Sequence, residues 1–268
     1  MKESDVIVNF QNSDVYRRET GADLLKKAIN RLKAKNPKIL EIGPGLGEIM
    51  ETAILNNNLH EQMVTFLEPN MNSSTHLQAK FPKSTVVSSN LENFLKMDAK
   101  ESKYDLIFAN FSLHWVENLD KQISKLSNLL NSGGLIVFAN TDSSRSFWGH
   151  IDSEVQNAFH GSKLFNIEKS HSMDDAQWVS VFTSLNEGGT FRAVSLTRLY
   201  GVAAVFKSKE ECLENFKSIV GSKYLKVGTG SSSDGIEKFI LNRLEKLSNS
   251  SGEIEVPASG FQVIVEKI

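Results

Sequence analysis

The sequence predicts an α/β fold in which a mainly parallel sheet carries helices on both faces. Over the first 150 residues, short apolar segments alternate with segments of helical spacing, and the connections between them are short. A glycine-rich loop follows the first apolar segment and precedes a helical one. Such a strand–loop–helix corner is typical of folds that bind a nucleotide at the sheet edge.

Apolar runs mark the expected strands of the first half. They are rich in Val, Ile, Leu and Phe and lack clean alternation, which indicates burial on both faces. These runs are 38–42, 63–68, 85–88, 104–110 and 135–140.

Apolar residues at helical spacing predict helices between these strands. Stripes begin at Leu24, Ile49 and Leu119, and the third continues to Leu130. The following Asn131-Ser132-Gly133-Gly134 segment resembles a glycine C-cap, so we expect that helix to end there.

The second half is predicted to contain three helices and two strands. The helices are expected at 174–185, 209–220 and 235–247, with a flexible loop at 228–235. The strands are expected at 191–200 and 261–268. No linker is long enough to separate independent domains, so one domain is expected over 1–268.

Composition excludes several classes of protein. Lys plus Arg total 30 against 32 for Asp plus Glu, which argues against a general nucleic-acid binder. The single cysteine excludes an intrachain disulfide or a multi-cysteine metal site, and His150, His160 and His171 are too far apart for a local metal motif. No apolar run reaches the roughly 20 residues of a membrane span, and the polar start lacks a signal sequence. We therefore expect a cytoplasmic protein with no metal and no membrane partner.

The glycine loop is the most informative motif of the chain. It reads Glu41-Ile42-Gly43-Pro44-Gly45-Leu46-Gly47-Glu48. A dinucleotide fingerprint needs G-x-G-x-x-G, but Glu48 occupies its third glycine position and would repel a pyrophosphate. Together with Glu41 it favours a ligand that carries an ammonium and no phosphate, such as S-adenosylmethionine (SAM). A dinucleotide site and a ligand-free turn remain the alternatives.

Glu68 ends the second predicted strand, and a carboxylate at that place can accept both hydroxyls of a ribose. This position does not discriminate between nucleoside cofactors. A solvent-exposed glutamate at a strand end is the alternative.

Four motifs in order resemble the class I SAM-dependent methyltransferases. The glycine loop resembles their E/D-x-G-x-G-x-G motif, and Phe66-Leu67-Glu68-Pro69-Asn70 resembles their second-strand acidic motif. The segment 104–115 (YDLIFANFSLHW) resembles their fourth strand and the turn after it, and 132–138 (SGGLIVF) the entry to the fifth. The resemblance implies a Rossmann-like sheet of seven strands, the last antiparallel, with a helical cap insertion.

The resemblance also implies which residues bind SAM. The glycine loop would pass the methionine part and the ribose, Glu41 would hold the ammonium and Glu68 the ribose hydroxyls. Asn90 and Leu91 match the adenine position, although the usual aspartate is absent there, and Asn110 would border the methyl group. The expected cofactor-binding residues are Glu41, Gly43, Pro44, Gly45, Gly47, Glu68, Pro69, Asn90, Leu91, Asn110 and Tyr16.

By the same resemblance, the chain would divide its tasks along its length. Residues 1–35 would cover the cofactor, with Tyr16 beside it; a packing-only N-terminus is the alternative. Residues 36–140 would form the SAM-binding core. Residues 141–268 would form the acceptor side, with a helical lid at about 201–259 that excludes water.

Residues after the fourth and fifth strands are the candidates for acceptor chemistry. His114 could act as a base or orient the acceptor, or it could simply pack beside Trp115. Trp115 could wall the pocket, and Arg145 could pair with an acceptor carboxylate or be a solvated residue at a helix start. Trp148 and Tyr200 complete the expected substrate-binding set.

The expected function is methyl transfer to a small organic molecule, with a carboxyl oxygen slightly favoured as acceptor. The turn at 110–115 looks like that of trans-aconitate, malonyl-carrier-protein and juvenile hormone acid methyltransferases. Other elements look like histamine N-methyltransferase, so an amine acceptor stays open. A non-catalytic SAM-binding regulator and an NAD-dependent oxidoreductase are rivals from other classes. A monomer or homodimer is expected, without nucleic acid.

Overall fold

The computed structural model describes residues 15–56, 59–97, 103–116, 119–141, 147–165, 177, 180–181, 183, 189–220 and 224–268. The chain forms two compact units. The first, called here the helical unit, comprises Met1–Tyr16, Ser143–Ser170 and Tyr200–Ser259. The second, the sheet unit, comprises Arg17–Asp142, His171–Leu199 and Gly260–Ile268. Two long strands contribute residues to both units, and each unit is described by itself.

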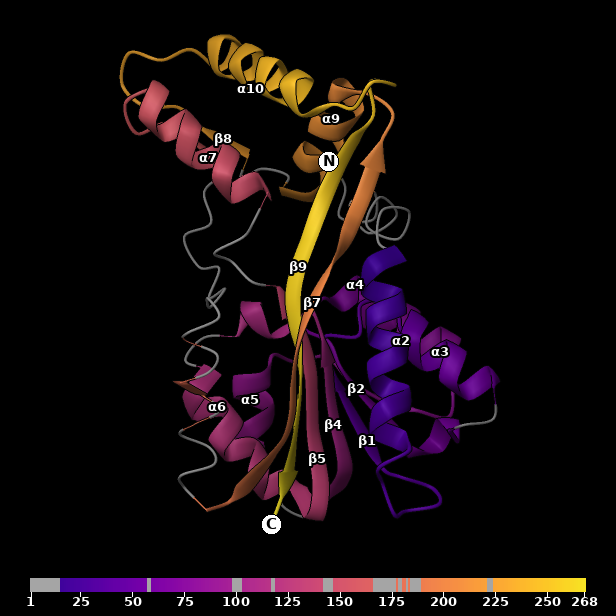
Figure 1. Cartoon of the computed structure of the whole chain (residues 1–268). Helices are drawn as coiled ribbons and strands as arrows, with labels where there is room; N and C mark the ends of the chain where they lie inside the picture. Colours follow the sequence, from indigo (N-terminus) through magenta and orange to yellow (C-terminus); the bar gives the residue numbers. More distant parts are fainter. Residues whose placement is uncertain are drawn as a thin grey trace. The chain divides into compact units, whose positions relative to one another are not determined.

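A seven-stranded sheet organises the sheet unit, in the order β3-β2-β1-β4-β5-β9-β7. The pairs among the first five strands are parallel, whereas β9 runs antiparallel to β5. This confirms the predicted seven strands with an antiparallel last strand (Figure 1). Their bounds are β1 Ile39–Ile42, β2 Val64–Leu67, β3 Thr85–Val87, β4 Tyr104–Asn110, β5 Leu130–Thr141, β7 Phe191–Phe206 and β9 Ile254–Lys267.

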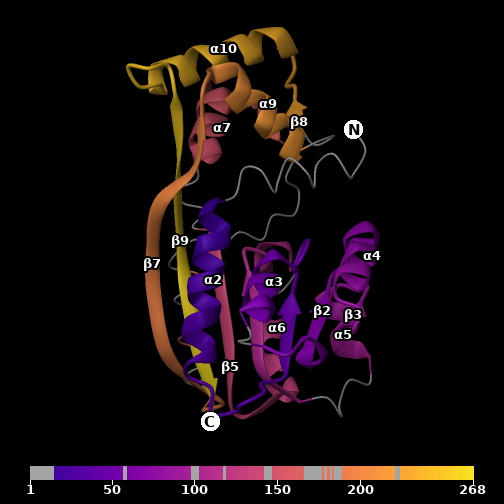
Figure 2. The ribbon, with the colours of Figure 1, turned by 90° about the vertical axis from the view of Figure 1, so that its right-hand side faces the viewer.

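Burial explains why the central strands show no alternation in sequence. Every residue of β1 and β2 is buried, because helices cover both faces of the sheet. Figure 1 shows α2 (Val15–Ile29), α3 (Glu48–Leu55) and α4 (Met71–Lys80) on one face. On the other face, α5 (Leu91–Lys96) and α6 (Leu119–Leu126) pack into the main hydrophobic cluster. The 90° view in Figure 2 shows α2 running alongside β5.

Short 3-10 turns lead into or follow several strands. They are η1 Glu61–Met63 before β2, η3 Leu113–Trp115 after β4, and η4 Ser127–Leu129 before β5. The turn η3 places His114 and Trp115 just beyond the carboxyl end of β4.

The expected glycine C-cap at Gly133-Gly134 is wrong. The third helix ends at Leu126, and the chain passes through η4 into β5 at Leu130. The register between β4 and β5 slips at this point, since Tyr104 pairs with Leu130 and Leu106 with Leu135. The glycines therefore serve an irregular strand entry, where Gly133 has a φ of 75°. An αL glycine has the same sequence signature in a bulge as in a helix cap.

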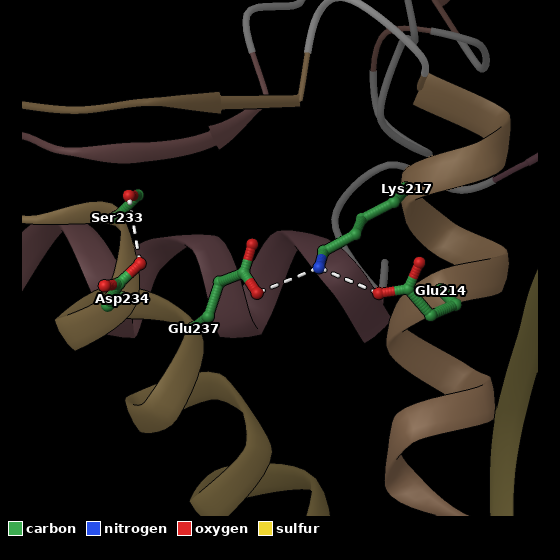
Figure 3. Close-up of polar contacts among 5 residues, drawn as sticks. All are labelled: Glu214, Lys217, Ser233, Asp234 and Glu237. Atoms are coloured by element: carbon green, nitrogen blue, oxygen red, sulfur yellow. Dashed lines mark hydrogen bonds and ion pairs between the residues drawn. The ribbon is translucent and has the colours of Figure 1, made fainter. Parts of the chain in front are cut away.

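The helical unit has its own hydrophobic core. It contains α7 (Phe147–Ala158), α9 (Lys209–Val220), α10 (Ser233–Leu247) and a two-stranded antiparallel sheet of β6 (Lys163–Phe165) and β8 (Tyr224–Lys226). Both helices predicted within 201–259 are present, the second beginning two residues earlier than expected. Lys217 of α9 contacts Glu214 of its own helix and Glu237 of α10, each at 2.9 Å (Figure 3).

Two further predictions concern a helix and two strands in the second half of the chain. The helix predicted at 174–185 lies largely outside the described residues. The strands predicted at 191–200 and 261–268 are present but longer, because β7 continues to Phe206 and β9 begins at Ile254. Among the described residues, no helix is long and apolar enough to cross a membrane.

Candidate functional site

The candidate site lies at the carboxyl ends of β1 and β4, where the strand order of the sheet reverses direction. Ligands of open α/β sheets bind at such a switch point. The loops that leave the two strands touch: a Cβ on Gly43 would lie 2.5 Å from the Cβ of Ser112. The Ser112 hydroxyl donates to the Ile42 carbonyl at 2.6 Å. Position 43 therefore requires glycine for close approach as well as for its backbone conformation.

The glycine loop turns through three left-handed residues. The φ angles of Gly43, Gly45 and Gly47 are 66°, 59° and 71°. Gly47 is the N-cap of α3 and donates its N–H to the Pro44 carbonyl at 3.0 Å. A Cβ on Gly47 would collide with Leu77 and Phe81, whereas a Cβ on Gly45 would meet no atom within 4 Å. Gly45 thus keeps its backbone open on the outer side of the loop.

The Glu68 carboxylate is attached to the glycine loop. Its Oε2 accepts the N–H of Gly45 at 3.2 Å, and its Oε1 accepts the N–H of Asn70 at 2.9 Å. Burial raises the pKa of this carboxyl, and the two backbone hydrogen bonds act in the opposite direction. The neighbouring Pro69 is exposed at the surface of the turn.

Glu41 is the most unusual group of the site. It lies in the middle of the sheet, between Phe66 of β2 and Phe108 of β4, and is only 2% exposed. Its Oε2 atom is buried and has no hydrogen-bond partner within the described part of the chain. Burial, and secondarily the charge of Glu68, raise the pKa of Glu41 to about 8. A buried carboxyl with an unused oxygen is costly unless a ligand supplies the missing donor.

The residues expected at the adenine begin α5. Asn90 is its N-cap, and its side-chain oxygen accepts the N–H of Asn93 at 2.9 Å. Leu91 is 4% exposed and belongs to the hydrophobic core. Asn90 therefore has a structural task that its proposed cofactor contact would share.

Asn110 ends β4 and connects it to α2. Its Nδ2 donates to the Arg17 carbonyl at 3.0 Å, while its Oδ1 is buried without a partner among the described residues. The Tyr16 side chain, one residue earlier on α2, lies outside the described residues.

His114 forms a hydrogen bond with a residue of the neighbouring strand. Its Nδ1 lies 3.0 Å from the Oδ1 of Asn140, which is fully buried on β5. Burial lowers the pKa of His114 to about 4, so the imidazole is neutral near pH 7. The Trp115 ring lies 4.8 Å from the His114 ring, and Trp115 is 60% exposed.

The other expected substrate-binding residues belong to the helical unit or lie outside the described residues. Arg145 lies outside the described residues. Trp148 is partly buried and packs against the core of the helical unit, where its ring stacks on Phe216 at 4.0 Å. Tyr200 is assigned to the same unit and is 63% exposed.

Sequence reasoning missed Asn140 and Arg17 as neighbours of the site. Asn140 ends the apolar run LIVFAN in the same way that Asn110 ends LIFAN, and that repeated signal could have found it. The Arg17 guanidinium lies over the Phe111 ring at 5.6 Å. Phe111 has a φ of 51°, a strained value for a non-glycine residue that often marks a functional turn.

A comparison with protein families matches residues 40–136 of the 268 to the methyltransferase domain. The matched segment runs from β1 into β5 and contains Glu41, the glycine loop, Glu68, Asn110 and His114. The chain contains a class I methyltransferase domain. Members of this class use SAM as the methyl donor.

Curated relatives of this methyltransferase domain match parts of the chain. A malonyl-[acyl-carrier protein] O-methyltransferase of Paenibacillus sp. is 33% identical over 138 residues, 47% of this chain and 48% of that protein. A second such enzyme, from Ilyobacter polytropus, is 32% identical over 105 residues, 38% of each chain. An uncharacterized methyltransferase of Bacillus cytotoxicus is 29% identical over 49% of this chain and 59% of its own length. The matches thus span well under two thirds of these relatives.

Solved structures share the fold of the methyltransferase domain at low sequence identity. A candidate methyltransferase from Bacillus halodurans C-125 aligns with a TM-score of 0.61 and 11% identity, covering 92% of this chain and 99% of the other. The plantazolicin methyltransferase BpumL in complex with S-adenosylhomocysteine (SAH) aligns with a TM-score of 0.56 and 12% identity. The alignment covers 99% of this chain and 90% of the other. Among the described residues, no group of three or more His, Cys, Asp or Glu could hold a metal ion.

Proposed function

We propose that this chain binds SAM in the sheet unit and transfers its methyl group to a small organic molecule, with a carboxyl oxygen favoured as acceptor. The observation that carries the proposal is Glu41, a fully buried carboxyl beside the glycine loop with one oxygen unpartnered among the described residues. With Glu68 nearby, a bound cationic amino acid would lower the raised pKa of Glu41 and ionise it, whereas a pyrophosphate would raise that pKa further.

The chain's own residues divide the binding task. Glu41 would accept the ammonium, Glu68 the ribose hydroxyls, and the loop at Gly45 would allow close approach of the backbone. Asn110 would present its unpartnered Oδ1 toward the positively charged end of the ligand. When bound, SAM supplies an activated methyl group on a good leaving group, so the protein must mainly align the acceptor and exclude water.

The carboxyl preference is supported by the relatives whose names state a carboxylate-type acceptor, malonyl-[acyl-carrier protein]. A carboxylate acceptor needs no base, since it is already deprotonated near pH 7. The same chemistry applies to a carboxyl group that is attached to an acyl-carrier protein. An amine acceptor is the second candidate, because the neutral imidazole of His114 could accept a hydrogen bond from its N–H group.

Two experiments test this function. Calorimetry should detect SAH and SAM binding at micromolar affinity and no NAD binding; the reverse pattern would reject the proposal. Incubation with methyl-labelled SAM and a cell extract, separated into small-molecule and protein fractions, should then yield a labelled product. Release of the label as methanol in mild alkali identifies a methyl ester, whereas a methylated amine retains it.

A further inference from the structure

Asn140 lies beside His114 at the site, although neither the sequence motifs nor the family comparison gave it a role. It is fully buried near the carboxyl end of β5, where β5 pairs with both β4 and β9. Its Oδ1 lies 3.0 Å from Nδ1 of His114, and its Nδ2 has no partner among the described residues. The one described side-chain hydrogen bond of this buried amide is with His114, so the amide is suited to orient that ring.

The identity of the contacting atom decides the tautomer. A carbonyl oxygen can only accept, so the Nδ1 of His114 must donate and therefore carries the ring proton. The Nε2 atom is then left with its lone pair. We propose that Asn140 is a positioning residue that holds His114 as the Nδ1–H tautomer, so that Nε2 can accept a hydrogen bond from an N–H or O–H group of the acceptor molecule.

The surroundings of His114 keep its imidazole neutral. The charged group near the ring is Arg17 of α2, whose positive charge opposes protonation, and burial acts in the same direction. Trp115, the following residue of η3, packs its ring against the imidazole of His114 and is itself largely exposed. The lone pair of a neutral Nε2 repels a carboxylate oxygen and attracts an N–H or O–H group, so it favours acceptor molecules that carry such a donor besides the atom that is methylated.

This inference rests on the proposed function, but its primary test does not need SAM or an acceptor. Nitrogen-15 NMR of the imidazole groups distinguishes a protonated from an unprotonated ring nitrogen. The chain has six histidines, and loss of signals in His114→Gln assigns the ring. At pH 7 we expect a protonated Nδ1 and an unprotonated Nε2. The opposite pattern, which an amide turned the other way would produce, or an even mixture of tautomers, overturns the proposal.

Two variants separate positioning from mere packing. Asn140→Asp keeps the acceptor oxygen and adds a charge, so the Nδ1–H tautomer should persist and the His114 pKa should rise clearly above about 4. Asn140→Leu removes the acceptor, so the fixed tautomer should relax. Gln262→Leu is the matched control, because Gln262 is also a buried polar residue at the end of the sheet but bonds the Thr20 carbonyl. It should leave the His114 signals unchanged.

A functional readout follows once labelled product is obtained. In the extract assay, Asn140→Leu should lower methyl transfer at least tenfold while SAH affinity changes less than twofold. Equal loss of both would assign Asn140 a structural role and contradict the inference. If Asn140→Leu does not fold, the wild-type spectrum and the Asn140→Asp titration still decide it. Failure of SAH to bind, by contrast, contradicts the proposed function and leaves the tautomer result standing.

Discussion

The Glu68 carboxylate accepts the backbone N–H of Gly45 at 3.2 Å, and so joins the end of β2 to the middle of the glycine loop. The two residues are 23 positions apart in the sequence. The bond is possible because β1 and β2 are parallel neighbours whose carboxyl ends meet at one edge. Glu68 therefore holds the loop in shape and is also the proposed contact of the ribose, so the two roles must be separated by experiment.

Replacement of Glu68 by alanine should weaken SAH binding by about 1.5–3 kcal/mol, the scale of hydrogen bonds to a charged group. Glu68→Gln keeps one acceptor oxygen and should lose less. Calorimetry with SAH measures both, and circular dichroism confirms that the fold is kept. Glu92→Gln, on the exposed surface of α5, is the control and should bind as the wild type does. Unchanged affinity in Glu68→Ala would show that the ribose assignment is wrong.

Replacement of Gly45 by valine should abolish SAH binding. A β-branched residue is strained at a φ of 59°, and its side chain would occupy the open side of the loop. Gly133→Val is a matched control, since Gly133 has a φ of 75° and also meets no atom within 4 Å. Both variants should lose similar stability in denaturant unfolding, and only Gly45→Val should lose the ligand. Retained affinity in a folded Gly45→Val protein would refute the role of the loop.

The sequence allowed most of the sheet unit to be predicted because its signals are local. Buried strands such as Ile39–Ile42 are short apolar runs, and the glycine loop marks its own corner. The bond between Glu68 and Gly45 follows from parallel topology and was partly foreseeable. The contact of His114 with Asn140 was not, because it joins positions 26 apart through strand register and a side-chain rotamer. The end of α6 was mispredicted because Gly133 looks alike in a helix cap and in an irregular strand.

Replacement of Trp115 by alanine should leave stability within about 0.5 kcal/mol of wild type, because the side chain is 60% exposed. SAH affinity should also be unchanged. Label transfer from SAM into the small-molecule product should fall several-fold if Trp115 walls the acceptor pocket. Leu247→Ala, an exposed apolar residue at the end of α10, serves as the control and should transfer normally. Normal transfer by Trp115→Ala would remove Trp115 from the acceptor site.

Glu41 should make the cofactor-free protein less stable as the pH rises. Its pKa is about 8 in the folded state against 4.5 for an ordinary glutamate, so folding favours the protonated form. Below pH 4.5 both states hold the proton and the contribution to stability is complete. Between 4.5 and 8 only the unfolded chain releases it, so the free energy of unfolding falls with pH, and above 8 this loss is complete.

The variant Glu41→Gln separates stability from binding in opposite directions. A neutral amide removes the pH-dependent cost, so urea unfolding should show the cofactor-free variant to be more stable than wild type at pH 9 and less dependent on pH. The same amide cannot offer a charged partner to the SAM ammonium, so affinity for SAM should fall at least tenfold. Glu51→Gln, on α3 and outside the loop, is the control for both measurements. If Glu41→Gln is more stable than wild type but binds SAM less tightly, the buried carboxyl serves binding rather than stability. If the variant and the wild type bind SAM equally well, the carboxyl has no role in binding.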